Sequence, residues 1–188
     1  MKILAINGSP RANGNTRQLI DRCLKPMQEK GYDTEIIQVG GVLLHGCNAC
    51  RSCKKTGRCI YNDDPINEWI EKMKEADAII LASPTYYANM TSELKAFIDR
   101  TGYPLSTNKL LSRKVGAPIV AARRGGAINV YNTIMAYFGI HNMIVPMSSY
   151  WNMGYGLEQG DVQNDEEGMR TMDNLGENMI YLLEKLHA

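Results

Sequence analysis

Short apolar runs alternate with amphipathic stretches along almost the whole chain. The runs are rich in Ile, Val, Leu and Ala, a composition typical of strands buried inside a parallel sheet. They predict five strands, at residues 2–6, 34–39, 78–82, 115–121 and 143–147. The second run has mixed polarity, which favours a place at the edge of the sheet.

The stretches between these runs have the periodicity of helices. They predict helices at residues 15–30, 65–75, 91–101, 127–137 and 165–187. Asp64 and Pro65 suit the cap and the first position of the second helix. We expect Pro26 to end or kink the first helix, because proline lacks the backbone N–H that the helix interior uses.

Five strands joined by helices predict an α/β fold, a single domain over residues 1–188 with a doubly wound parallel sheet. The commonest strand order for five strands is 2-1-3-4-5, and ligands then bind where the chain reverses direction between strands one and three. The loops after Ile6, Ala82 and Ala121 should therefore carry the function.

The first of these loops, residues 7–16, joins a strand to a helix N-terminus, which attracts anions. Its short polar side chains Ser9, Asn15 and Thr16 can donate hydrogen bonds, and Arg11 adds positive charge. The pattern indicates a phosphate monoester site. It differs from a nucleoside-triphosphate loop and from GxGxxG, and an ordinary polar turn is the alternative.

The second and third loops supply aromatic rings, glycines and charge. Tyr86 and Tyr87 can stack on a planar ring, although packing or subunit contacts would explain them equally. In the third loop, Gly125 and Gly126 permit close backbone approach to a ligand. Arg123 and Arg124 can stabilise an anionic ring system or bind a second phosphate, and a solvated surface pair is the alternative.

Four of the five cysteines, Cys47, Cys50, Cys53 and Cys59, lie within one short segment at about residues 45–62. This clustering argues against a disulfide framework. Compact runs of this kind hold iron–sulfur clusters, whereas structural zinc more often uses two separated pairs. Free or disulfide-paired thiols and zinc stay open as alternatives. The isolated Cys23 is interpreted as a buried apolar side chain.

Composition and charge narrow the range of expected partners and locations. The net charge of +1 gives no general attraction to nucleic acid or anionic lipid. No apolar run is long enough to cross a bilayer, and the N-terminus lacks the features of a signal peptide. We therefore expect a cytoplasmic protein without nucleic-acid or membrane partners.

The segments GSPRANGNT, ASPTYYANMTSELKAFIDR and ARRGG together resemble the NADPH-dependent FMN reductases of the flavodoxin-like superfamily. The resemblance implies an FMN cofactor. It places Ser9, Arg11, Asn13, Asn15 and Thr16 at the FMN phosphate. It also places residues at the isoalloxazine ring: Pro84, Thr85, Tyr86, Tyr87, Ala88 and Asn89.

The cysteine run resembles that of the iron–sulfur flavoproteins, relatives that carry four compact cysteines after the second strand. This resemblance implies a 4Fe–4S cluster on Cys47, Cys50, Cys53 and Cys59. Ile60 follows the last cysteine, where bacterial ferredoxins have proline.

The expected function is an FMN-dependent oxidoreductase. Electrons would pass from NAD(P)H or a reduced iron–sulfur donor through FMN to a small acceptor or a carrier protein such as ferredoxin. The basic residues around the cysteines either receive such a carrier, offset the charge of a cluster, or are merely solvated. A quinone or nitroaromatic reductase, a flavodoxin-like electron carrier and a zinc-binding module are the alternatives, and the resemblance implies a homodimer or homotetramer.

Overall fold

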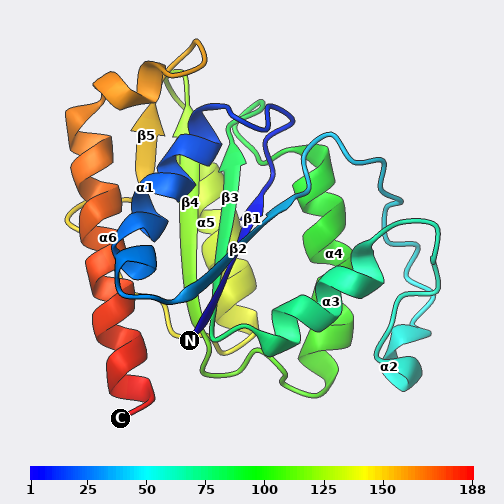
Figure 1. Cartoon of the computed structure of the whole chain (residues 1–188). Coiled ribbons are helices and arrows are strands. Elements are labelled where there is room, and N and C mark those ends of the chain that lie inside the picture. Colours follow the sequence, from blue (N-terminus) through cyan, green and yellow to red (C-terminus); the bar gives the residue numbers. More distant parts are fainter.

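The computed structural model describes residues 1–188 and contains one five-stranded parallel sheet (Figure 1). The strands lie in the order β2-β1-β3-β4-β5. Their bounds are β1 (Lys2–Asn7), β2 (Asp33–Gln38), β3 (Ala78–Pro84), β4 (Val115–Ala122) and β5 (Met153–Tyr155). The predicted fold class and strand order are confirmed, and the chain reverses direction between β1 and β3.

Helices cover both faces of the sheet. One face packs against α1 (Asn15–Glu29) and α6 (Glu166–Leu186). The other packs against α3 (Ile66–Glu75), α4 (Ser92–Thr107) and α5 (Ala127–Ile140). Two short helices complete the chain, namely α2 (Cys53–Thr56) and the 3₁₀ helix η1 (Asp161–Asn164). In Figure 1, α2 lies beyond α3 and α4, outside the layers of the fold.

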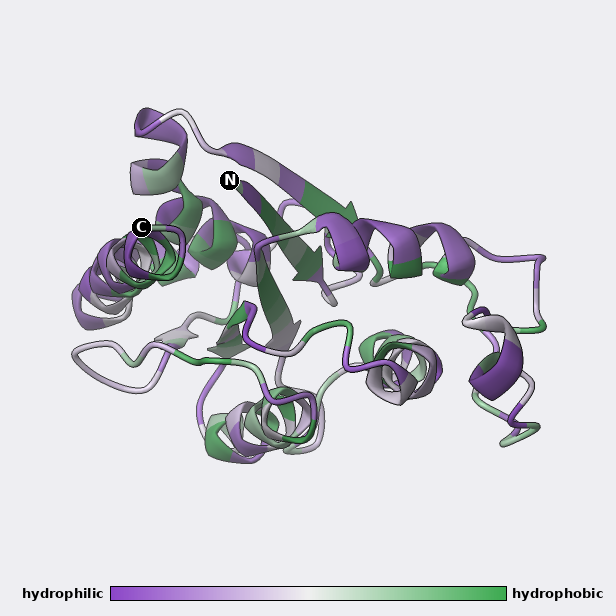
Figure 2. Cartoon of the chain, turned by 90° about the horizontal axis from the view of Figure 1, so that it is seen from below, coloured by the Kyte–Doolittle hydropathy of each residue, from purple (hydrophilic) through white to green (hydrophobic).

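The two faces of the sheet have separate apolar cores. In β1, Leu4 and Ile6 belong to the core beneath α3, α4 and α5, whereas Ile3 and Ala5 belong to the core beneath α1 and α6. This alternation follows from the two-residue period of a strand. Figure 2 shows the inner strands as predominantly hydrophobic and β2 as mixed, as expected for an edge strand.

The position predicted for the fifth strand, residues 143–147, is wrong. Ile144 makes a single bridge to Val115, and the chain then leaves the sheet and returns as β5 at Met153. The backbone N–H groups of Gly116 and Val120 donate to the carbonyls of Ile144 and Asn152. Pro118 lies between them in β4 and has no N–H, so the ladder is interrupted at this point.

The helix boundaries agree with those predicted from the sequence to within one residue, apart from the following differences. Helix α1 continues past Pro26 to Glu29, so it does not end at this proline. Helix α4 runs beyond the predicted residue 101 to Thr107, and α5 runs beyond the predicted residue 137 to Ile140. The short helices α2 and η1 were not predicted. The carboxylate of Asp64 accepts a hydrogen bond from the backbone N–H of Ile66, but α3 begins one residue later than predicted, so that Pro65 and not Asp64 is at the cap position. None of the helices combines the length and apolar character needed to cross a membrane.

Candidate functional site

A cleft opens at the carboxyl ends of β1, β3, β4 and β5, where the strand order predicts a ligand site. Four loops form its walls. The lining residues are Ser9, Arg11, Asn15, Thr16, Pro84, Thr85, Tyr86, Ala121, Ala122, Arg123, Gly156 and Leu157. The three loops singled out from the sequence therefore meet around one cleft.

The first loop presents unpaired backbone donors to this cleft. The first hydrogen bond of α1 runs from Gln18 to the carbonyl of Gly14, and no side chain caps the helix. The N–H groups of Asn15, Thr16 and Arg17 thus have no helical acceptor. The side chain of Arg11 is exposed and makes no ion pair. Free donors and a free cation at a helix N-terminus are what a phosphate monoester requires.

Two residues predicted at the phosphate, Asn15 and Asn13, have surroundings that differ from those of the other predicted phosphate residues. The side chain of Asn15 is engaged with the loop after β5, donating to the Glu158 carbonyl at 2.9 Å and accepting from the N–H of Gly160 at 2.9 Å. Asn13 is exposed and does not line the cleft. Ser9 and Thr16 are buried at the cleft floor.

The second loop is a tight turn fixed to the neighbouring strand. The N–H and hydroxyl of Thr85 both donate to the carbonyl of Ala121, at 2.8 and 3.1 Å. Tyr86 and Asn89 exchange backbone hydrogen bonds, while Tyr87 and Ala88 between them have left-handed backbone angles, φ of 48° and 58°. Such angles cost energy for residues other than glycine and occur preferentially at ligand sites.

Because of this turn, only some of the residues predicted at the flavin ring line the cleft. Pro84, Thr85 and Tyr86 line the cleft. Ala88 and Asn89 do not, and Tyr87 projects fully into solvent.

The third loop brings Arg123 to the cleft, but Arg124, Gly125 and Gly126 do not line it. Gly126 has a φ of 92° and packs against Ala88 so closely that a β-carbon there would lie 3.1 Å from the Ala88 Cα. It therefore positions the second loop against the third.

Four lining residues were not among the site residues predicted from the sequence. Ala121 and Ala122 lie at the end of β4, and Gly156 and Leu157 follow β5. A β-carbon at Gly156 would lie 2.8 Å from the Asn15 amide nitrogen, so this close approach requires glycine. The two glycines around Tyr155 were the available signal.

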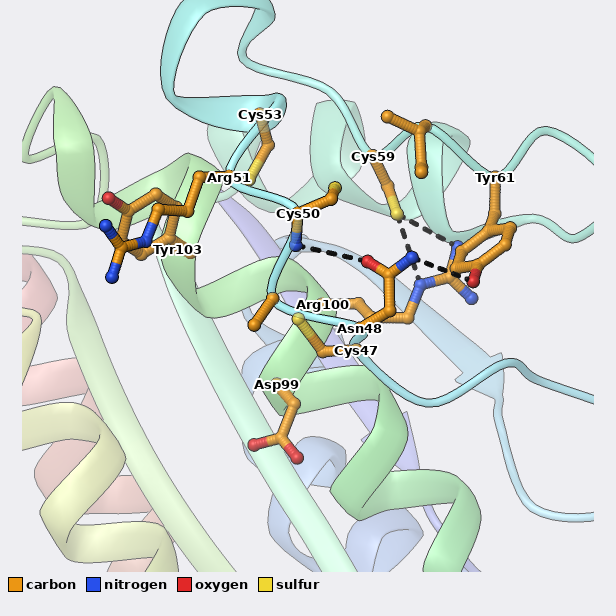
Figure 3. Close-up of a pocket in the computed structure, with 12 residues that line it drawn as sticks. Cys47, Asn48, Cys50, Arg51, Cys53, Cys59, Tyr61, Asp99, Arg100 and Tyr103 are labelled. Carbon is orange, nitrogen blue, oxygen red and sulfur yellow. Dashed lines mark hydrogen bonds between the residues drawn. The ribbon is translucent and has the colours of Figure 1, made fainter.

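A second hollow lies between the cysteine segment and α4 (Figure 3). All four clustered cysteines line it, together with Asn48, Ala49, Arg51, Ile60, Tyr61, Asp99, Arg100 and Tyr103. Its volume is about 300 Å³. The predicted ligands are thus gathered around one space, although their side chains do not form a group that would hold a metal ion.

The thiols of this hollow differ in their environment. Burial raises the pKa of Cys53, and the nearby charges of Cys50, Cys59 and Cys47 raise it further. Hydrogen bonds from Ser52 lower the pKa of Cys50. The fifth cysteine, Cys23, is fully buried beneath α6, and burial raises its pKa strongly. This is the inert apolar environment that the sequence predicted.

The doubly wound sheet, with a cleft at its reversal point and a phosphate-type loop, defines the flavodoxin-like class of α/β proteins. A solved structure supports this class. The Trp repressor binding protein from Bacillus subtilis superimposes with a TM-score of 0.69 over 92% of this chain and 96% of that protein, at 20% identity.

Sequence comparisons identify the family. The model of the NADPH-dependent FMN reductase family matches residues 1–158. An iron–sulfur flavoprotein of Methanocaldococcus jannaschii is 39% identical, with 98% of each chain covered. An iron–sulfur flavoprotein of Methanosarcina thermophila is 33% identical over 98% of this chain and 96% of the relative.

The chain belongs to the NADPH-dependent FMN reductase family, alongside relatives named iron–sulfur flavoproteins. Membership supports FMN as the cofactor and an oxidoreductase as the activity.

Proposed function

We propose that this chain is an FMN-dependent oxidoreductase that takes electrons from NAD(P)H or a reduced iron–sulfur donor and passes them to a small acceptor. The observation that carries the proposal is the meeting of uncapped α1, Arg11 and the turn after β3 around one cleft. When bound, FMN supplies the capacity to exchange electrons singly or in pairs.

The phosphate of FMN fits the first loop. The free N–H groups at the start of α1 and the hydroxyls of Ser9 and Thr16 are suitable donors. Arg11 supplies the countercharge. Asn15 acts on the site indirectly, because its amide holds the loop that contains Glu158 and Gly160.

The ring of FMN fits the part of the cleft between the second and third loops. Pro84 and Thr85 form one wall, and Tyr86 offers an aromatic face beside them. Arg123 adds a cation at the same end, which favours the anionic form of a reduced flavin. Each of these groups is attached to the end of a strand, which keeps the wall rigid.

We further propose that the hollow in the cysteine segment holds a 4Fe–4S cluster on Cys47, Cys50, Cys53 and Cys59. A single zinc ion needs all its sulfur ligands at about 2.3 Å, whereas a cluster spaces its ligands around a larger volume. Four thiols distributed around one mainly apolar hollow support the larger group. The names of the iron–sulfur flavoprotein relatives support it independently.

The surroundings of this hollow fit an acidic electron-carrier protein as a partner. Arg51, Lys54, Lys55 and Arg58 are exposed on the cysteine segment and on α2. Their charge would attract a carrier such as ferredoxin to the side of the molecule where the cluster is proposed.

Anaerobic mixing of the FMN-loaded protein with NADPH or NADH tests the enzymatic proposal. Rapid bleaching of the flavin absorbance, followed by turnover with a quinone, would support an NAD(P)H-dependent reductase. Bleaching by a reduced ferredoxin alone would support the iron–sulfur donor. Slow reduction by every donor, with stably bound FMN, would indicate an electron carrier and contradict the proposed enzyme.

A further inference from the structure

Cys59 is held more firmly than a surface cysteine. Its backbone N–H donates to the Asn67 side-chain oxygen at 2.8 Å, and the Asn67 side-chain nitrogen donates to the Cys59 carbonyl at 3.0 Å. Asn67 is itself buried on α3. These two hydrogen bonds fix the backbone of Cys59. In this respect Cys59 differs from Cys47 and Cys50, which are exposed.

The sulfur of Cys59 is also fixed, by Arg100 of α4. The Nε and Nη2 groups of Arg100 both lie 3.3 Å from the Cys59 Sγ (Figure 3). The Arg100 side chain is completely buried, and the Asp64 carboxylate paired with it is 2% exposed. The cation that contacts this thiol is therefore shielded from solvent.

Each hydrogen of the Arg100 guanidinium has an acceptor. One Nη1 hydrogen is donated to the Asp64 carboxylate and the other to the His45 carbonyl at 3.3 Å. Nη2 donates to Asp64 at 3.0 Å as well as to Cys59, and Nε donates to Cys59. Two of the five donors that arginine possesses thus converge on a single sulfur.

This arrangement needs a sulfur that accepts strongly. A buried ion pair is costly unless the remaining donors are satisfied, and a neutral thiol is only a weak acceptor. A thiolate ligand carries the charge that two N–H groups from a cation would stabilise.

We propose that Arg100 is a positioning residue for the cluster site, which holds the Cys59 sulfur in place and raises the reduction potential of the cluster through two N–H···S hydrogen bonds. Hydrogen bonds to ligand sulfurs are among the factors that set the potentials of such clusters. This inference rests on the cluster proposed above. It adds a determinant outside the cysteine segment, on helix α4.

Arg100→Lys tests this role, because lysine keeps the positive charge beside Asp64 but loses the planar fork. The full chain is reconstituted with iron and sulfide without oxygen, and the cluster is titrated potentiometrically. The expected result is an unchanged iron content and a reduction potential more negative than that of the wild type. An iron-loaded variant with the wild-type potential would overturn the proposal.

Arg58→Gln is the matched control. Arg58 is an exposed cation directly before Cys59, and it makes no side-chain hydrogen bond to the sulfur. Its removal should shift the potential less than Arg100→Lys does. A shift of equal size would show that overall charge governs the potential, and would overturn the role of the hydrogen bonds.

If Arg100→Lys does not fold, the double variant Asp64→Asn, Arg100→Gln removes both buried charges together and should show the same lowered potential. A wild-type potential in an iron-loaded double variant would overturn the proposal. Wild-type protein that takes up no iron would refute the cluster itself. This outcome differs from that of a bound cluster whose reduction potential does not depend on Arg100.

Discussion

The hydroxyl of Thr91 donates a 2.7 Å hydrogen bond to the carbonyl of Gly8, joining the loops after β3 and β1. The same hydroxyl caps α4 by accepting from the N–H of Leu94, and the N–H of Thr91 donates to Ser83. The start of α4 is thereby fixed at the reversal point of the sheet. A later turn of the same helix carries Arg100 to the cysteine hollow.

Thr91→Val should destabilise the protein because it leaves the Gly8 carbonyl and the start of α4 without their partner. Loss of a helix cap or of a buried hydrogen bond costs about 1–2 kcal/mol. The free energy of unfolding, measured in urea, should fall by that amount, and FMN binding should weaken. Thr91→Ser keeps the hydroxyl and is the control. Equal stability of the two variants would contradict this account.

Arg11→Ala should weaken FMN binding by about ten- to a hundredfold, because a hydrogen bond to a charged group contributes about 1.5–3 kcal/mol. Fluorescence titration with FMN and with riboflavin, which lacks the phosphate, gives the comparison. The loss should appear with FMN and not with riboflavin.

Arg17→Ala is the control for Arg11→Ala, since the Arg17 side chain lies in the first turn of α1 and is paired with Asp21 at 2.8 Å. Its FMN affinity should equal that of the wild type. If both ligands lose affinity equally in Arg11→Ala, the phosphate assignment is incorrect.

Cys50→Ala should abolish the iron–sulfur signal and leave FMN bound, because the cysteine hollow and the flavin cleft share no lining residue. Cys23→Ala, which changes a buried cysteine beneath α6, should retain both groups. Iron, sulfide and FMN are measured on each variant after reconstitution. Full iron content in Cys50→Ala would argue against this ligand set.

Acid should destabilise the fold through His141, which is buried against the ring of Tyr137. Burial lowers the pKa of His141 below its ordinary value near 6.5, so the unfolded chain binds the proton more readily. Its contribution to stability is complete above about pH 6.5 and is lost as the pH falls toward the lowered folded pKa. The effect cannot exceed about 1.4 kcal/mol per pH unit.

His141→Gln removes this titration. Unfolding free energies measured between pH 7 and pH 5 should decline less steeply for the variant than for the wild type. Parallel declines would show that His141 is protonated equally well in the folded and unfolded chains.

The pattern of apolar runs was sufficient to predict the architecture, because β1, β3 and β4 are buried on both faces and read as continuous apolar segments. The predicted position of the fifth strand was wrong because of a residue in the neighbouring strand, β4. Residues 143–147 have the composition of a strand, but Pro118 in β4 withholds one hydrogen bond that a continuous fifth strand would need. Sequence periodicity within one segment does not contain that information.

The candidate site was predictable where a residue's role follows from its place at the end of a strand. Ser9, Arg11, Thr16, Thr85 and Tyr86 all reach the cleft. Orientation within a loop was not predictable, since the left-handed turn at Tyr87 and Ala88 sends Tyr87 outward. Contacts between distant segments, such as Asn15 with Glu158 and Arg100 with Cys59, also depend on the folded chain.

The two proposed cofactors can be checked together in an absorption spectrum of protein purified without oxygen, recorded before and after dithionite. We expect flavin bands on a broad iron–sulfur shoulder, with both bleached by the reductant. Flavin bands alone would contradict the cluster on the four cysteines. A colourless protein that fails to bind added FMN would contradict the flavin cleft itself.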